Sequence, residues 1–172
     1  MYVFIAQGIG VVAAALTILS FQFKKNKSLY LLQAVSGLLF SVNFLMLGAY
    51  TAACLNFINL FRGGLLAGGD RFKSRWFAVT LMVAYTAVTV VTYANWLSVL
   101  VLVAQLVGTV AMWSRKGRII RLGQLFVVSP SWLIHNVINF SLGGLITEAV
   151  SIVSILISLI RYRKGFEETK QT

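Results

Sequence analysis

The positive charges of this chain are confined to four short clusters that are separated by long apolar segments. All 15 Lys and Arg residues lie in residues 24–27, 62–75, 115–121 and 161–170. Glu148 is the only charged residue in the segments that precede and separate the clusters, which are residues 1–23, 28–61, 76–114 and 122–160. Because a transmembrane helix needs about 20 apolar residues, these segments have room for one, two, two and two membrane spans.

The positions of the clusters also predict a topology. Basic residues stay on the cytoplasmic side of a membrane, so every two-span segment is expected to leave that side and return. The pattern predicts an all-α membrane protein with seven transmembrane helices, the N-terminus outside and the C-terminus in the cytoplasm. The first segment has no cation before its apolar stretch, so we expect a retained helix and no signal peptide. The expected spans are Val3–Phe23, Leu29–Leu47, Thr51–Leu66, Trp76–Val91, Leu97–Trp113, Leu122–Phe140 and Leu145–Ile160.

Composition supports membrane insertion and argues against other classes of protein. Hydrophobic residues make up 59% of the chain and charged residues 11%, against roughly 25% charged residues in a soluble domain. The net charge of +11 is spread over four loops, so we expect no nucleic acid and anionic lipid headgroups as the cytoplasmic partners. With one cysteine and one histidine, no disulfide framework, metal site or cofactor is expected. No enzyme is expected either, because no paired carboxylates and no nucleophile with a base are evident.

Two hairpins suggest an internal repeat. Residues 43–51 and 139–147 both read N-F-x-x-x-G-x-x-T, and the similarity indicates two related three-span blocks. Three spans finish on the face opposite to their start, so a second copy in the same orientation needs one more crossing, which residues 76–91 supply. The sequence thus predicts a 3-1-3 arrangement of two parallel three-helix repeats. The expected organisation is a first bundle (1–66), a cytoplasmic linker with a linker helix (67–95), a second bundle (96–162) and a cytoplasmic tail (163–172).

Three segments of the first half carry a family resemblance. They are Ser20–Leu29 (SFQFKKNKSL), Leu32-Gln33 and Leu47–Thr51 (LGAYT). With them the chain resembles, over nearly all of its length, the YgjV family of bacterial inner-membrane proteins. The resemblance implies a multi-pass protein of the bacterial inner membrane, and it implies a fold more than a function.

A more distant similarity is to the PQ-loop and SWEET superfamily, whose members are built from three-helix bundles. The pair Phe21-Gln22, followed by Lys27-Ser28, is similar to the Pro-Gln and Lys-Ser elements that close the first helix there, with Phe21 in place of the proline. The similarity implies a SWEET-like architecture in which Asn56 faces the substrate. By the hairpin register Asn56 corresponds to Ile152, so the second bundle is expected to lack the matching amide.

Polar side chains inside a bilayer are costly and normally turn toward the protein interior. Asn56 and Asn59 are three residues apart on one helix face, and His135 and Asn139 are four apart on another. Such residues either line one cavity or form hydrogen bonds between helices. The candidate substrate-binding residues are Asn43, Asn56, Asn59, His135, Asn136 and Asn139.

Three further residues are unusual in a membrane span. Pro130 removes a backbone hydrogen bond, so it is expected to kink the sixth span and is a candidate hinge. His135 either takes up a proton or serves as a neutral packing group. Glu148 is expected within one turn of the outer hairpin, where it either reaches the interface or holds a cation or a proton.

The leading functional hypothesis is a small-solute transporter or facilitator with its site between the two bundles. The alternative is a non-transporting membrane scaffold, sensor or regulatory protein. A water-accessible cavity lined by Asn56, Asn136 and His135 would favour transport, and a dry, close-packed centre would favour the alternative. The sequence identifies no solute, and it leaves a homo-oligomer open.

Overall fold

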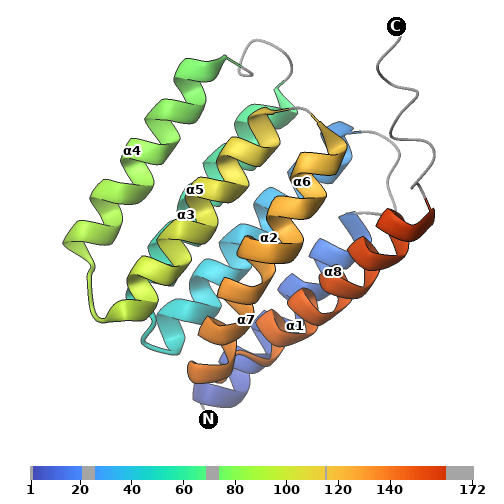
Figure 1. Ribbon diagram of the computed structural model, residues 1–172. Coiled ribbons are helices and arrows are strands. Elements are labelled where there is room, and N and C mark those ends of the chain that lie inside the picture. Colours follow the sequence, from blue (N-terminus) through green and yellow to red (C-terminus); the bar gives the residue numbers. More distant parts are fainter. Residues whose placement is uncertain (1, 21–25, 69–73, 115, 162–172) are drawn as a thin grey trace, which may run out of the picture.

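The computed structural model describes residues 2–20, 26–68, 74–114 and 116–161, which form helices joined by short turns and contain no strand. The predicted all-α class is therefore confirmed. The helices, shown in Figure 1, are α1 (Tyr2–Ser20), α2 (Asn26–Met46), α3 (Tyr50–Ala67), α4 (Arg75–Val91), α5 (Trp96–Trp113), α6 (Gly117–Gly123), the π-helical turn η2 (Gln124–Val128), α7 (Ser129–Ile138) and α8 (Leu142–Arg161).

Most helices begin and end within three residues of the expected spans, and the expected end of the first, Phe23, lies outside the described residues. The exception is the span expected over residues 122–140. It begins five residues earlier, at Gly117, and is divided into α6, η2 and α7. Pro130 has no N–H to donate to the preceding turn. The backbone widens just before it, and the N–H of Ser129 donates to the Gln124 carbonyl, five residues back. The irregularity expected at Pro130 is thus a π turn.

The two ends of the helix bundle differ in charge. One end, here called the turn end, holds residues 47–49, 92–95 and 139–141, and none of these residues is charged. The other end, here called the basic end, holds residues 66–68, 74–76, 113–114 and 116–118, around which the described cations gather. Positive φ angles at Gly48 (77°) and Phe140 (53°) reverse the chain at two of the turns.

The helices close into a ring. α2 packs against α1 and α3, and α7 packs against α5 and α8. α8 also contacts α1, and α3 contacts α5. The group α1–α3 and the group α5–α8, in which α6, η2 and α7 run on from one another, therefore meet on both sides. α4 lies outside this ring, where it packs against α3 and α5 (Figure 1).

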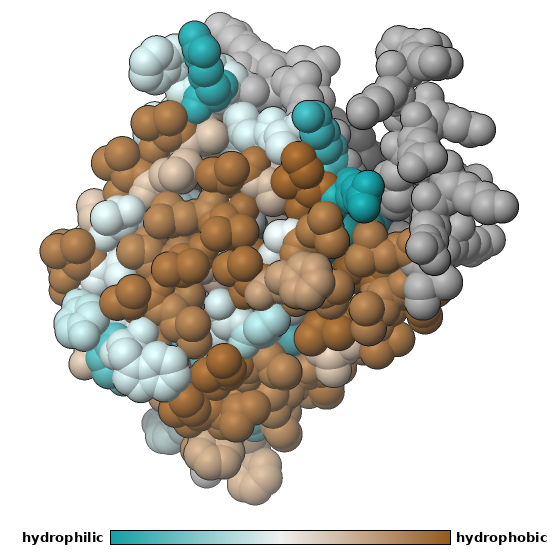
Figure 2. Space-filling view, in the orientation of Figure 1, coloured by the Kyte–Doolittle hydropathy of each residue, from teal (hydrophilic) through white to brown (hydrophobic). Residues whose placement is uncertain are grey.

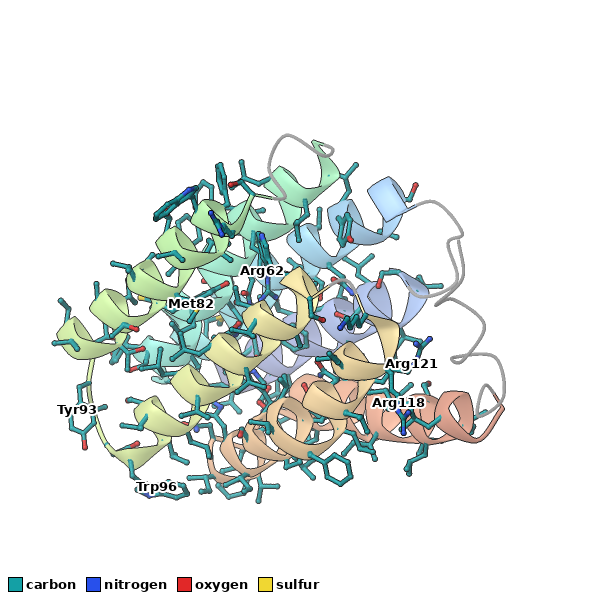
Figure 3. The ribbon with its side chains drawn as sticks, turned by 45° about the horizontal axis from the view of Figure 1, so that its top comes forward. Arg62, Met82, Tyr93, Trp96, Arg118 and Arg121 are labelled. Carbon is teal, nitrogen blue, oxygen red and sulfur yellow. The ribbon has the colours of Figure 1, made fainter. Side chains whose placement is uncertain are left out.

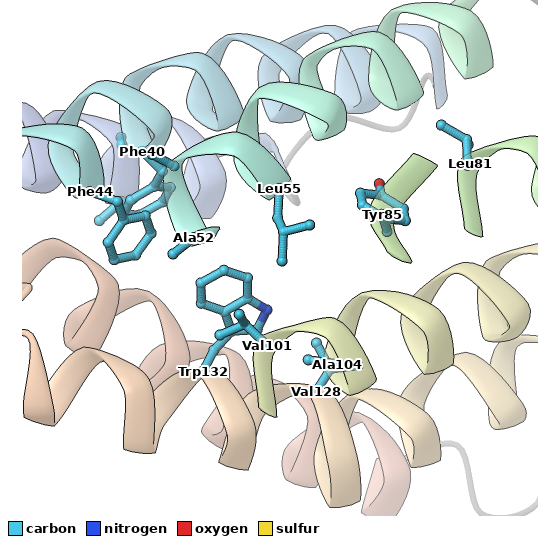
Figure 4. Packing of buried hydrophobic residues seen from close by; sticks show 13 residues of the cluster. Phe40, Phe44, Ala52, Leu55, Leu81, Tyr85, Val101, Ala104, Val128 and Trp132 are labelled. Atoms are coloured by element: carbon cyan, nitrogen blue, oxygen red, sulfur yellow. The ribbon is translucent and has the colours of Figure 1, made fainter. Parts of the chain in front are cut away.

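The apolar core lies where the two groups of helices face each other. Phe44 of α2 stacks on Trp132 of α7 with ring centroids 5.7 Å apart, and Leu55 and Val101 are both fully buried beside them (Figure 4). This contact spans 88 residues of sequence, so it depends on the tertiary fold and not on local pattern.

The outer surface is also largely apolar. Phe4 and Val91 are each 85% exposed and Phe126 is 71% exposed, and apolar side chains cover most of the face shown in Figure 2. Soluble proteins rarely expose so continuous an apolar surface. α1 and α5 have the length and hydropathy of membrane spans, and three shorter stretches are similarly apolar, Tyr30–Met46, Arg75–Val91 and Leu142–Ile157.

Candidate functional site

A cavity of about 1000 Å³ occupies the centre of the ring, between α1–α3 on one side and α5–α8 on the other. Tyr30, Leu66 and Met112 line it near the basic end, and Phe44 and Gly144 line it at its deepest point. Phe44 lies four residues before Gly48, and Gly144 lies four residues after Phe140. At a rise of 1.5 Å per residue the cavity therefore stops about 6 Å short of the turns.

The walls of the cavity are rich in amides that come from both groups of helices. The Asn56 side chain is 7% exposed, and its Nδ2 donates to the Ala52 carbonyl of its own helix at 3.0 Å. The Asn59 Oδ1 accepts a hydrogen bond of 2.7 Å from the Tyr85 hydroxyl of α4. Within the described part of the chain, six amide side chains line the cavity, those of Gln33, Asn56, Asn59, Gln105, Gln124 and Asn136.

Three of the six residues predicted as substrate-binding, Asn43, His135 and Asn139, lie toward the turn end and do not line the cavity. The buried Asn43 donates to the Ala6 carbonyl at 2.7 Å and accepts from the Ser141 hydroxyl at 2.9 Å, so it connects α2 to α1 and to the turn before α8. Asn139 follows α7 and donates to the His135 carbonyl at 2.9 Å. These amides meet the hydrogen-bonding needs of packed helices and turns.

His135 is likewise surrounded by protein. Its ring contacts those of Phe44 and Trp132 edge-on, with centroids 5.2 and 5.4 Å apart, and its Nδ1 has no hydrogen-bond partner. Of the three residues expected to line a transport cavity, Asn56 and Asn136 do so and His135 does not.

Close helix contacts shut the cavity off at the turn end. Gly143 of α8 packs directly on the backbone of Gly10 in α1, so that no side chain fits between them. The Gln7 Oε1 accepts a hydrogen bond of 2.9 Å from the backbone N–H of Leu142. On the opposite side of the ring, the Thr51 hydroxyl of α3 is 3.0 Å from that of Ser98 in α5.

Among the residues that the structure describes, three charged side chains line the cavity, and none of them is a site residue predicted from the sequence: Arg62, Arg121 and Glu148. The Arg62 Nη1 donates to the Gln105 Oε1 of α5 at 3.4 Å. In Figure 3, Arg62 lies between α3 and α5, whereas Arg118 and Arg121 lie near the start of α6. The charge pattern of the sequence places Arg62 in the cluster of loop cations at residues 62–75. The signal that distinguishes it is the uncharged run of residues 63–69 that follows it, which leaves Arg62 inside α3.

The position expected for Glu148 is corrected by the structure. α8 begins at Leu142, so Glu148 lies nearly two turns inside the helix and not within one turn of the hairpin. It lines the cavity, and its Oε2 is buried without a hydrogen-bond partner.

The hairpin register also differs from the one that the sequence motif suggested. The N–H of Ala49 donates to Phe44 and the N–H of Ser141 to Asn136, both at 2.9 Å, around the positive-φ residues Gly48 and Phe140. Asn56 and Glu148 each lie eight residues after these two residues, so aligning the turns on their positive-φ residues pairs Asn56 with Glu148, whereas the sequence motif pairs it with Ile152. The alignment on the shared Asn-Phe dipeptide is shifted by one helical turn from the alignment on the turns, because Asn43 lies inside α2 whereas Asn139 follows the end of α7.

Comparison with known proteins gives a cellular location. A family model described as a bacterial inner membrane protein, Imp-YgjV, matches residues 4–165. The chain is 28% identical over 164 residues to the inner membrane protein YgjV of Escherichia coli (strain K12), covering 92% of this chain and 84% of that protein. No solved structure matches the chain. These matches specify a membrane and leave the solute and the reaction open.

Proposed function

The chain belongs to the Imp-YgjV family of bacterial inner membrane proteins, and we propose that it is a small-solute transporter or facilitator. The observation that carries the proposal is the cavity of about 1000 Å³ between the two groups of helices. Polar groups inside a membrane protein are costly, and they gather where a solute or water passes. Six amides and three charged side chains of the described residues line this cavity.

The proposal includes a topology and an architecture. Seven helical rods cross the membrane, with the N-terminus and the turn end in the periplasm and the basic end in the cytoplasm. α1–α3 and α5–α8 are two parallel repeats of SWEET-like type, and α4 is the additional crossing between them. The matching backbone hydrogen bonds around Gly48 and Phe140 support this relation. On this topology the cavity faces the cytoplasm and is closed toward the periplasm.

The alternative function is a non-transporting scaffold, sensor or regulatory protein. Such a protein has no need for a polar cavity and would be expected to have a close-packed centre, since small residues and dense contacts stabilise membrane helices. The cavity and its amides therefore favour transport.

A flux assay on purified protein tests the proposal. Proteoliposomes are loaded with an isotopically labelled extract of small bacterial metabolites, and mass spectrometry identifies the solutes that leave faster than from protein-free vesicles. We expect at least one small polar solute to do so. If none does, the transport function is wrong.

Two asparagine-to-leucine variants, one inside the cavity and one outside it, test whether the solute crosses through the cavity. Asn56→Leu replaces a cavity amide by an apolar group of similar volume, so we expect the flux to fall severely while the amount of folded protein stays the same. Asn139→Leu makes the same exchange outside the cavity and should leave the flux unchanged. If Asn56 served only helix packing, Asn56→Leu would lower stability by about 0.5–2 kcal/mol, and flux would fall only in proportion to the loss of folded protein.

A further inference from the structure

The charged side chains divide the cavity along its depth. Glu148 and Asn56 each lie eight residues from the residue that reverses the chain at the turn end, which places both about 12 Å from that end. Arg62 follows Gly48 by fourteen residues, so its Cα lies about 21 Å from the same end. The carboxylate is thus on the deep side of the cavity, and the guanidinium is on the side of the basic end.

The deep part presents acceptor oxygens that lack well-placed donors. The Glu148 Oε2 and the Asn136 Oδ1 are both buried, and neither atom has a hydrogen bond of normal geometry within the protein. The Ser129 side chain interacts with the Glu148 carboxyl group, and the His135 side chain interacts with Asn136. The Asn136 side chain lies directly against Gly144, where an added Cβ would come within 2.5 Å of the amide. Gly144 is one helical turn from Glu148 on α8, so the two acceptors line neighbouring parts of the wall. Buried acceptors without donors are unfavourable, and a ligand that brings N–H groups would satisfy both.

Aromatic rings complete this part of the wall. Phe44 and Trp132, which stack with centroids 5.7 Å apart, also line the cavity. Aromatic faces attract cations, and tryptophan does so most strongly. A carboxylate, an amide oxygen and aromatic rings together provide the groups that bind an ammonium ion.

The part of the cavity nearer the basic end has the opposite charge. Arg62 lines it and makes a long hydrogen bond, 3.4 Å, from one Nη1 to Gln105. A guanidinium carries five N–H donors in a planar fork that matches a carboxylate. Arg121 lines the same cavity. Two cations favour a solute that carries an anionic group and disfavour one that carries only positive charge.

We infer that the cavity binds a small zwitterion, a solute with an ammonium group at one end and a carboxylate at the other. The ammonium group lies at Glu148 and Asn136, against Trp132, and the carboxylate lies at Arg62. This inference rests on the proposed transport function and adds the chemical class of the solute.

A charge-matched series of probes tests the class. Glycine, β-alanine, 4-aminobutanoate and 5-aminopentanoate are zwitterions whose charged groups are increasingly far apart, and butylamine and butanoate each carry one of the two charges. Uptake of each labelled probe is measured as the rate into proteoliposomes containing the full chain minus the rate into protein-free vesicles, because neutral butylamine and butanoic acid cross lipid without a protein. We expect uptake of at least one zwitterion at a rate at least tenfold above that of either single-charge probe. Uptake of butylamine or butanoate at the zwitterion rate would overturn the inference.

Variants of the charged residues test which side chain binds the ammonium group and which binds the carboxylate of the zwitterion. Glu148→Gln keeps the shape and removes the negative charge, so zwitterion uptake should fall at least tenfold, whereas Glu148→Asp should retain part of it. Arg62→Gln should also abolish uptake. Arg118→Gln removes an exposed arginine that does not line the cavity and should leave uptake unchanged. The melting temperature of each variant shows whether it is folded, and full zwitterion uptake by folded Glu148→Gln would contradict the inference.

Failure of this inference can be told apart from failure of the transport function. If the metabolite extract yields a neutral solute such as a sugar and no zwitterion, the cavity transports but the assigned class is wrong. If no solute of any class crosses, the transport function itself is wrong.

Discussion

Chemically identical side chains have different roles in this protein because they lie at different depths. Asn56 and Asn136 line the cavity. Asn43, nearer the turn end, instead joins α2 to the Ala6 carbonyl and to the Ser141 hydroxyl. The Gly10 position also packs against the Asn43 amide, where an added Cβ would lie 2.9 Å from its Nδ2. Asn43 is therefore a packing residue that joins α2 to α1 and to the turn before α8 at the closed end.

Asn43→Ala should destabilise the protein. The change removes two hydrogen bonds and leaves the buried Ser141 hydroxyl without its acceptor, so we expect a loss of about 1–3 kcal/mol, toward the lower end in a membrane protein. Thermal unfolding of the purified protein measures the effect. Asn139→Ala removes only a local bond to the His135 carbonyl and should cost less than half as much. Equal losses in the two variants would show that Asn43 does not connect helices.

At the scale of the elements, the rod formed by α6, η2 and α7 is the irregular one. Gln124 opens the π turn and its Nε2 donates to the Ser129 hydroxyl at 3.1 Å, just before Pro130. Gln124, Val128 and Trp132 all line the cavity. The π turn therefore helps determine which side chains of this rod face the cavity, a role in which such turns often occur.

Pro130→Ala should regularise this rod. Alanine restores an N–H that can donate to the Phe126 carbonyl, so the π turn is expected to become α-helical. One recovered hydrogen bond is worth about 0.5–1.5 kcal/mol, which corresponds to amide exchange slowed up to about tenfold. Hydrogen–deuterium exchange over residues 124–130 provides the measurement. The control is Phe126→Ala, which changes an exposed side chain of the same turn and should not slow exchange. Unaltered exchange in Pro130→Ala would mean that the proline does not cause the π turn.

At the scale of the whole molecule, an apolar exterior surrounds a centre in which a polar cavity lies beside an apolar core. The apolar exterior follows from the solvent: lipid is in contact with the outer faces of the helices, and the polar groups must find partners inside. Among the residues that the structure describes, the cations lie toward one end, and such a charge bias is what orients a chain in the bacterial inner membrane.

Cysteine labelling tests this orientation. In a Cys54→Ser background, a membrane-impermeant maleimide applied to intact spheroplasts should label Tyr93→Cys, which replaces a 59% exposed residue at the turn end. It should label Lys116→Cys at the basic end only after the membrane is permeabilised, because the basic end is expected in the cytoplasm. The reverse pattern would invert the proposed topology, and labelling of both sites in intact cells would mean that the two ends are on the same side.

The sequence by itself determined the membrane class, the helical rods and the end at which the charges lie. These properties are local: hydropathy over about 20 residues predicts a span, and the loop cations predict its orientation. The amides Asn56, Asn59 and Asn136 could be predicted as site residues from the sequence. The reason is that a polar side chain in an apolar membrane helix is costly toward lipid and therefore faces the protein interior or a cavity.

Only the tertiary structure decided which of those amides share a cavity and which charged residues accompany them. Asn43 and His135 passed the same sequence test as Asn56, but the packing of α1, α2 and α8 closes the end where they lie. Glu148 was misplaced because the depth of a residue depends on where its helix begins, and α8 begins three residues earlier than expected. From the sequence, Arg62 is expected among the cations of a loop, but its hydrogen bond with Gln105 shows that its side chain lies between α3 and α5. Depth and facing direction are set by contacts between distant helices, and no local pattern encodes them.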